Sequence, residues 1–552
     1  MKHTIYKIFA ACLLVVIIAS CKKDLAIENP NNPTPDSIKD ETGIVSFATG
    51  GTYINGFRNA KYTDGVFGPF WSGALGFHEM MGDVIGCDAA NAFMNQIGCP
   101  EKVVTDGGVT VNNPNSPNTQ RGLIRSINSN QSAGNNTLYY EWAYMYNLIS
   151  SCNLLLEKVD GITYPGDAVS KKAAIKAWAF WWKGYAYSRI GSVYFAGLIN
   201  NSSFTTNGNY VSKEAMIVEA NSNLDKAAAA AASATSATEF TAMWAKIIPT
   251  AFQTGKGGSQ SPAMLQRNVN TMKARNLMVN KTVAAMTAAD WNNIVTLTNA
   301  GITATDNVFT MRSDAVGNLY TSGQLLSGKV QSSAPGSNTY KLSERWVQEF
   351  RSGDQRRAQN VGMGATYTGQ ADRGNAHFTR FFLRNGGNAL PGVAIYANNG
   401  PGAFEMFAAG NFEENELMKA EALIYLGSPA QINQGLAIID AVRTLQGAGL
   451  AAVSGTGLTA AQAREELRRE RRIVCAFRGL SFYDARRWGV TRPLSSGGGR
   501  TGCSMISVFT SGTVISTNGT IDYNYIDYWD VPGNELTYNP PASGSAPVVN
   551  PN

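Results

Sequence analysis

Between residues 411 and 489 the chain carries three consecutive segments with the apolar spacing of an α-helix. Segments 411–427, 432–449 and 458–489 place an apolar residue every three or four positions, which puts these residues on one side of a helix. The apolar positions are Leu417, Ala420 and Ile424, then Ile438, Val442 and Leu445, then Leu467, Val474 and Phe477. Thr459 and Gln462 form a capping box that opens the third segment. Such helices must bury their apolar sides on one another, so we expect paired, stacked helices.

The same spacing occurs earlier in the chain. Leu138 to Leu156 has apolar residues at steps of three and four, and segment 171–197 carries aromatic residues on all sides. Further helices are expected over Ser212–Ala232, Asn268–Met286 and Ala288–Ala300. The sequence therefore predicts a mainly α fold, in which tetratricopeptide-like helical hairpins stack in a right-handed superhelix with long loop-rich insertions.

Two groups of side chains in these helices have both a structural and a functional interpretation. The tryptophans of segment 171–197 could bind a sugar, but we favour packing in the core because rings surround the whole helix. The arginines of segment 458–489 lie away from its apolar positions, and we expect them to form a solvated basic face: Arg464, Arg468 and Arg472.

The N-terminus predicts export and a lipid anchor. Lys2 and Lys7 accompany an apolar run that is too short to span a bilayer, which is typical of a signal peptide. Small residues then lead to Cys21, as in the lipobox of bacterial lipoprotein precursors, and cleavage there would leave the thiol to carry a diacylglycerol. An ordinary signal peptide with a chance cysteine is the alternative. The expected divisions are a lipoprotein signal peptide over 1–20, a flexible tether over 21–36 and one folded domain over 37–552.

Four short motifs stand in order within segment 411–489. They are Ala420-Glu421-Ala422, Ala441-Val442-Arg443, Arg469-Glu470-Arg471 and Phe482-Tyr483-Asp484-Ala485-Arg486-Arg487-Trp488-Gly489. Their order and spelling resemble the C-terminal part of the SusD/RagB family, in which these motifs are structural. Arg478 stands where that family usually has an acidic residue, and Ser481 stands where it usually has arginine. The resemblance is therefore to a divergent member.

Two further segments extend this resemblance over nearly the full chain. Asp290-Trp291 matches a dipeptide common at this place in the family, where the tryptophan packs. Residues 529–536 and Asn539-Pro540 resemble the closing segment of the family. The predicted helical pairs then fall at about 137–300 and 411–489.

The resemblance implies a function at the cell surface. SusD/RagB proteins are lipid-anchored, face the exterior from the outer membrane of Bacteroidetes, and cover a SusC-like TonB-dependent transporter. They capture a glycan, or a peptide in RagB-like members, and deliver it to that transporter without catalysis. We therefore expect a lipid-anchored outer-membrane protein with no enzyme activity and no cofactor.

Charge and motif content agree with this expectation. Loss of Lys2 and Lys7 with the signal peptide lowers the formal net charge from +6 to about +4, which is too small to predict a nucleic-acid partner. The sequence has no HExxH, CxxC or phosphate-loop pattern and only three histidines, so no metal site is predicted.

Three loop-rich regions are expected to carry the ligand site, at about 84–136, 302–410 and 491–552. An aromatic ring can cover the apolar face of a sugar, while polar side chains bond to its hydroxyl groups. Candidate residues are therefore rings and their polar neighbours in these loops: Asn91, Phe93, Asn95, Arg312, Asp314, Tyr320 and Tyr396. For each of them an ordinary loop residue is the more common case.

The cysteines suggest one disulfide and two buried thiols. Cys87 and Cys99 bracket a short loop in an exported chain, so a disulfide between them is possible. Cys152 and Cys475 lie on apolar helix sides and are expected to be buried thiols.

Two other classes of function stay open. A glycoside hydrolase needs paired carboxylates, and Asp83 and Asp88 could form such a pair. A purely structural helical-repeat scaffold would bind protein partners only. Cleavage of glycans would favour the first class, and association with a transporter without affinity for any glycan or peptide would favour the second.

Overall fold

A computed structural model provides the fold. It describes residues 38–54, 74–87, 98–113, 119–132, 136–253, 255–312, 330, 340–364, 378–384, 405–509 and 512–552. The predicted signal peptide and tether, including Cys21, lie outside this part of the chain.

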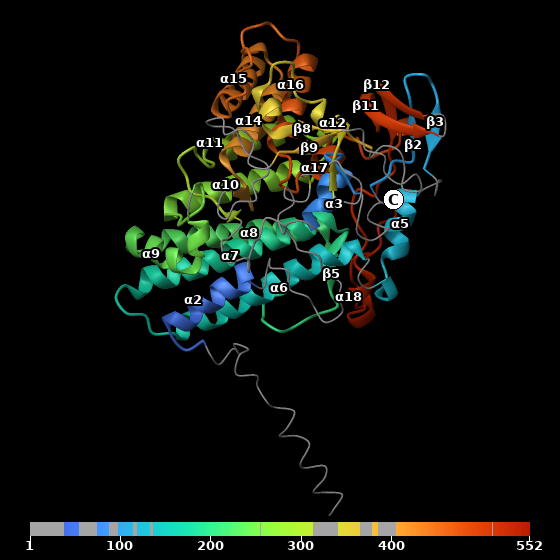
Figure 1. The fold of residues 1–552 in the computed structure, drawn as a ribbon. Coiled ribbons are helices and arrows are strands. Elements are labelled where there is room, and N and C mark those ends of the chain that lie inside the picture. Colours follow the sequence, from blue (N-terminus) through green and yellow to red (C-terminus); the bar gives the residue numbers. More distant parts are fainter. Residues whose placement is uncertain are drawn as a thin grey trace, which may run out of the picture.

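A stack of helices forms the first half of the molecule (Figure 1). It consists of α6 (Thr137–Lys158), α7 (Ala168–Val193), α8 (Lys213–Ala232), α9 (Ala237–Ile247), α10 (Pro262–Val279) and α11 (Ala288–Asn299). Helix α7 packs against α6, α8 and α9, and α10 packs against α8 and α11. The sequence predicted every one of these helices except α9.

A second group of helices continues the stack. It contains α14 (Phe412–Leu426), α15 (Pro429–Leu445), α16 (Ala460–Val474) and α17 (Ser481–Arg487). Helix α14 packs on α11 as well as on α15 and α16, so the two groups are continuous. The ring of Trp291 stacks on that of Tyr425 at a centroid distance of 4.9 Å, which confirms that this tryptophan packs.

Local signals explain where these helices begin and end. Thr459 and Gln462 make the expected capping box, and Thr287 with Asp290 makes a second one. Helix α14 ends at Gly427, whose φ of 85° lies in the left-handed region that glycine adopts without steric cost.

Shorter helices and turns connect these groups. The α-helices are α2 (Glu41–Thr49), α3 (Ala74–Met81), α5 (Thr119–Ile127), α12 (Glu344–Val347), α13 (Gln355–Asn360) and α18 (Gly533–Tyr538). A π-helical turn, η2, covers Gly50–Ile54. The 3-10 turns are η3 (Asn130–Ser132), η4 (Val159–Gly161), η5 (Thr250–Phe252), η6 (Val283–Ala285) and η11 (Leu494–Ser496).

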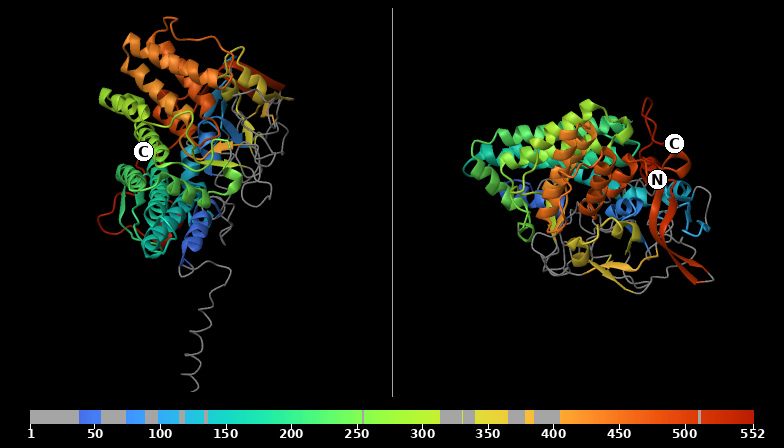
Figure 2. Two further views of the ribbon diagram at one scale, coloured as in Figure 1. Left: turned by 90° about the vertical axis from the view of Figure 1, so that its left-hand side faces the viewer. Right: turned by 90° about the horizontal axis from the view of Figure 1, so that it is seen from above.

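All strand pairs among the described residues are antiparallel, and most are short. One four-stranded sheet has the order β11 (Arg500–Phe509), β12 (Gly512–Asp522), β2 (Lys102–Val104) and β3 (Thr110–Asn112). The two-stranded pairs are β1 (Ile85–Cys87) with β7 (Tyr340–Leu342), β4 (Ala196–Leu198) with β5 (Tyr210–Ser212), β6 (Thr310–Arg312) with β10 (Glu405–Phe407), and β8 (Val361–Met363) with β9 (Phe381–Leu383). Both views of Figure 2 place the helical stack on one side and the yellow segments of residues 340–384 on the other.

The aromatic residues of α7 lie in the core. Trp178, Trp181 and Trp182 are all fully buried. Their rings pack edge to face or tilted against one another and against Trp244 and Phe309. Core packing, the interpretation favoured for these tryptophans, is confirmed.

Two expectations about the helix surfaces are wrong. In α15 the buried side contains Ile432, Leu436, Ile439 and Val442, whereas Leu445 is 43% exposed, because the apolar stripe runs through Ile439 rather than Ile438, one position later than predicted. In α16 the expected solvated basic face is largely covered. Arg472 is buried and Arg468 is held in ion pairs, because carboxylates from distant segments meet them.

The predicted fold class is confirmed. The described residues are mainly helical, with helical pairs stacked side by side and small sheets beside them. In the described part of the chain no helix is both long enough and apolar enough to cross a bilayer.

Candidate functional site

The four sequence motifs of segment 411–489 are joined by buried ion pairs. Glu421 of α14 accepts two hydrogen bonds, at 2.5 and 2.6 Å, from the guanidinium of Arg487 in α17. Asp484 pairs with Arg471 and Arg487, at 2.8 and 2.7 Å. Although burial opposes ionisation, Arg471 and Arg487 keep the pKa of Asp484 below its usual value.

The remaining motif residues extend this network to α13 and α15. Glu470 lies between Arg443 and Arg356, with ion-pair distances of 2.8 and 2.5 Å. All three side chains are at least 95% buried. The motifs therefore hold helices together. Their buried charges form ion pairs with one another, as a structural role requires.

The three loop-rich regions come together beside this network. Strand β1 pairs with β7, with Ile85 opposite Leu342, so the region that begins at residue 84 touches the region 302–410. Strand β12 pairs with β2, which joins the region 491–552 to the same place. Segments that are far apart in sequence thus meet at one junction, which is where we place the candidate site.

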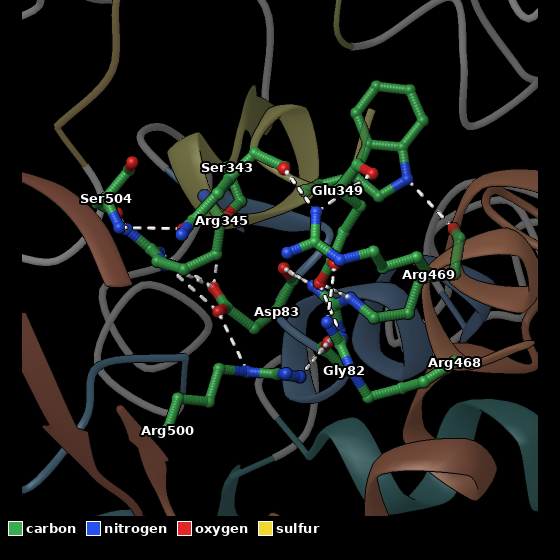
Figure 3. Close-up of polar contacts among 12 residues, drawn as sticks. Gly82, Asp83, Ser343, Arg345, Glu349, Arg468, Arg469, Arg500 and Ser504 are labelled. Carbon is green, nitrogen blue, oxygen red and sulfur yellow. Dashed lines mark hydrogen bonds and ion pairs between the residues drawn. The ribbon is translucent and has the colours of Figure 1, made fainter. Parts of the chain in front are cut away.

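Asp83 is the centre of this junction (Figure 3). It follows α3 with a φ of 59°, an uncommon conformation for a residue other than glycine. Its carboxylate accepts hydrogen bonds from Ser343 Oγ at 3.0 Å and from Arg345 Nη2 at 2.7 Å. Arg500 Nε lies 3.3 Å from its Oδ2 atom. Each of these partners comes from a different part of the chain than Asp83 itself.

These contacts fix the charge of Asp83. Burial opposes its ionisation, but Arg345 and then Arg500 hold the pKa of Asp83 well below its usual range. A general acid of a glycoside hydrolase needs the opposite shift. Asp83 is therefore unsuited to that role, and Asp88, its proposed partner, lies outside the described residues.

Helix α16 supplies the other wall of the junction. Arg468 contacts Glu349 at 2.7 Å and Glu465 at 2.7 Å. Arg472 contacts Glu349 at 2.7 Å, and it donates hydrogen bonds to the carbonyl groups of Gly82 and Asp83 at 2.9 and 3.1 Å. Of the three arginines expected to face solvent, Arg472 therefore binds the segment that follows α3, Arg468 is held by Glu349 and Glu465, and Arg464 is exposed as expected.

A cavity of about 400 Å³ opens between α12, α16 and β11. Its lining includes Arg345, Arg468, Arg469 and Arg500, together with Glu349 and Glu465. The wall at the start of β11 contains Gly499, Arg500, Thr501, Gly502 and Cys503. The sequence did not predict this cavity, because the candidate ligand residues were chosen around rings in the loops and Arg468 was expected to face solvent.

A second cavity, of about 550 Å³, lies between the ends of α7 and α10 and the C-terminal segment. Tyr525 and Tyr528 line it, but the guanidinium of Arg486 lies 4.0 Å from the ring centroid of Tyr528. Arg486 donates hydrogen bonds to the carbonyl groups of Ser192 and Val279, at the ends of α7 and α10. The arginine in this part of the cavity therefore caps the ends of two helices of the stack.

Of the seven predicted ligand residues, one lies within the described part of the chain. Asn91, Phe93, Asn95, Asp314, Tyr320 and Tyr396 lie outside the described residues. Arg312 ends β6, opposite Glu405 of β10, and only its backbone is described. Their role in binding stays a prediction.

The structure describes the predicted buried thiols but not both cysteines of the possible disulfide. Cys152 and Cys475 are buried, as expected, and burial raises the pKa of each thiol to about 12. Cys99 is buried as well, but the side chain of Cys87 is not described, so the disulfide stays a prediction. Among the described residues no group of three or more His, Cys, Asp or Glu side chains could hold a metal ion.

Comparison with known proteins supports the motif resemblance. The model of the SusD family matches residues 416–543. No curated protein matches the sequence. Three solved structures share the fold at 14–15% identity. A SusD-like carbohydrate-binding protein from Bacteroides fragilis NCTC 9343 has a TM-score of 0.58 at 14% identity, with 91% of this chain and 99% of the other covered.

The other two structures give similar values. A SusD-like carbohydrate-binding protein from Bacteroides vulgatus ATCC 8482 has a TM-score of 0.54 at 15% identity, with 92% and 98% of the two chains covered. A structure determined with a xylogluco-oligosaccharide has a TM-score of 0.52 at 14% identity, with 92% and 99% covered. Residues 416–543 therefore match the model of the SusD family, and the chain shares its fold with SusD-like structures.

Proposed function

We propose that this protein binds a glycan, either an oligosaccharide or a polysaccharide fragment, at the cell surface without cleaving it. The observation that carries the proposal is the shared fold over more than nine tenths of the chain with proteins described as SusD-like and carbohydrate-binding. One structure with this fold was determined with a xylogluco-oligosaccharide. Fold alone does not define a ligand, so the proposal extends to glycans as a class.

The meeting of three loop-rich regions at one junction supports this proposal. Loops held by a rigid scaffold are where binding groups are usually found, and the buried ion pairs around Asp83 provide such a scaffold. The contacts of Asp83 do not suit a catalytic acid of a hydrolase, because this carboxylate is bonded to Arg345 and its pKa is lowered.

We further propose delivery of the glycan to a SusC-like TonB-dependent transporter, with Cys21 as a lipid anchor in the outer membrane. Both parts rest on the lipobox at Cys21 and on the family resemblance. A partner that receives the ligand accounts for a binding protein held at the membrane surface. A peptide in place of the glycan is an outcome that the binding experiment would identify.

The test is isothermal titration against panels of plant, host and microbial polysaccharides and of peptides. We expect micromolar binding to one class of glycan. The combined substitution of Phe93, Tyr320 and Tyr396 by alanine should weaken that binding by at least about tenfold, because stacking contacts on the sugar are lost. Far-ultraviolet circular dichroism should stay helical.

A matched control replaces a ring outside these loops. Phe204 is 72% exposed and lies in none of the three loop-rich regions. The variant Phe204→Ala should bind like the parent protein. Equal affinity of parent and loop-ring variant would show that the predicted rings are not the site, and binding of peptides alone would replace the glycan proposal.

A further inference from the structure

The cavity between α12, α16 and β11 is surrounded by more positive than negative charge. Its ion-pair cluster contains five arginines and three carboxylates: Arg345, Arg468, Arg469, Arg472, Arg500, Asp83, Glu349 and Glu465. Two positive charges are left over. Charge that is removed from water without a counter-charge is costly, so such a surplus favours an anion in the cavity.

The surplus positive charge is poorly screened by water, because the arginines of the cluster are largely buried. The side chains of Arg345, Arg472 and Arg500 are 3%, 4% and 11% exposed. Burial, followed by the positive charge of Arg500, lowers the pKa of Arg472 to about 10, whereas the pKa of Arg345 is raised by its carboxylate partner. Arg472 therefore lies in a region where further positive charge is unfavourable.

Two of the arginines have donors that the described residues do not use. Arg500 donates from Nη2 to the carbonyl of Gly82 at 3.2 Å and its Nε lies 3.3 Å from Asp83 Oδ2, whereas no described residue accepts from Nη1. Arg469 bonds to Glu465 through Nε, and its Nη2 has no acceptor among the described residues. Both side chains line the cavity. A guanidinium with free donors binds oxyanions through paired hydrogen bonds.

We propose that this cavity binds the oxyanion of the ligand, the carboxylate of a uronic acid or a sulfate ester on the glycan. Arg500 and Arg469, which both line the cavity, donate to the oxyanion. The assignment to a glycan rests on the function proposed above. The ligand would accordingly be an acidic glycan, and free inorganic anions of the same chemistry would occupy the cavity more weakly.

The first experiment tests the anion site without any glycan. Inorganic sulfate at low millimolar concentration should raise the melting temperature of the protein relative to sodium chloride of equal ionic strength. These concentrations avoid the general stabilisation that concentrated sulfate gives through exclusion from protein surfaces. Arg500→Gln should remove the increase. Arg469→Gln, at a side chain that is 22% exposed, provides a second variant if Arg500→Gln does not fold.

Arg351→Gln is the control for both variants. Arg351 is 41% exposed, pairs with Glu466, and does not line the cavity, so the sulfate effect should persist in it. Absence of any specific sulfate effect in the parent protein would overturn the anion site. A full effect in both Arg500→Gln and Arg469→Gln would equally overturn its assignment to these arginines.

The second experiment separates a glycan anion from a free anion. An oligogalacturonide and its methyl ester share one sugar chain and differ in charge. The acid should bind about tenfold more tightly than the ester, and the two should bind equally to Arg500→Gln. Equal binding of both by the parent protein would overturn the acidic-glycan assignment. A sulfate effect with no glycan binding in any panel would reject the proposed glycan function and retain an anion site.

Discussion

Glu79 shows how one substitution in a motif changes the charge of a buried site. Its side chain is fully buried on α3, and it accepts hydrogen bonds from the backbone of Gly479 at 2.8 Å and from Ser481 Oγ at 2.6 Å. Ser481 stands where the family usually has arginine. Glu79 makes no ion pair within the described residues, and burial raises its pKa.

This shift predicts a dependence of stability on pH. The pKa of Glu79 is higher in the folded than in the unfolded protein, so its contribution is complete below the unfolded value of 4.5 and is lost as pH rises through the folded value. Chemical unfolding at pH 5 to 8 should show that Glu79→Gln becomes progressively more stable relative to the parent as pH increases. Asp160→Asn, at a side chain that is 65% exposed, should leave the slope unchanged. Parallel curves for Glu79→Gln and the parent would refute this account.

Pairs of helices in this fold are joined by buried ion pairs as well as by apolar contacts. Arg275 of α10 and Glu414 of α14 form one such link, with hydrogen bonds from both Nε and Nη2 to the carboxylate. Their side chains are 8% and 0% exposed. Within a buried pair each charge depends on the other, because neither can be solvated by water.

Removal of one partner should therefore be costly at this position. Arg275→Met should lower the free energy of unfolding by about 3–5 kcal/mol, since Glu414 is left buried and unpaired. The double variant Arg275→Met/Glu414→Leu should lose less, because both charges are removed. Urea unfolding measures all three proteins.

Lys273 provides the matched control on the same helix. It pairs with Asp225 of α8, and the two side chains are 28% and 59% exposed. Lys273→Met should cost at most about 1 kcal/mol, as is usual for ion pairs in contact with water. Equal losses for Lys273→Met and Arg275→Met would mean that the buried pair does not link the helices.

The C-terminal segment closes the whole molecule. Trp529 is buried, exchanges backbone hydrogen bonds with Val193 and Phe195 at 2.8 Å, and packs its ring near those of Tyr194 and Phe482. The end of the chain thus lies on the helical stack formed by its first half (Figure 1). This arrangement makes residues 136–312 and 405–552 one folded body rather than two.

The proposed anchor is tested on the whole protein in its own cell. Cys21→Ser should move the protein from the membrane fraction to the soluble fraction, because the thiol that would carry the diacylglycerol is absent. Mass spectrometry of the parent protein should find acyl chains on residue 21. The melting temperature should be unchanged, since residue 21 is predicted to begin a flexible tether. An acyl-free parent protein would reject the anchor.

The helices and their motifs were determined by the sequence itself. Apolar spacing and capping residues act within one or two turns, so α14, α16 and the capping box at Thr459 could be predicted from neighbouring residues alone. The aromatic helix α7 was assigned to the core for the same reason. The same local signals did not predict α9, the short helices α2, α3, α5, α12, α13 and α18, or the register of the apolar stripe in α15.

The tertiary structure decided which charges meet. Nothing local indicates that Arg345 and Arg500 surround Asp83, or that Arg472 binds the backbone beside it, because these contacts join segments hundreds of residues apart. The arginines of α16 were predicted to form a solvated face. Periodicity shows which side of a helix is apolar, but it does not show which segments cover the other side. The charged cavity exists only where those segments converge, and so it could not be predicted from the sequence.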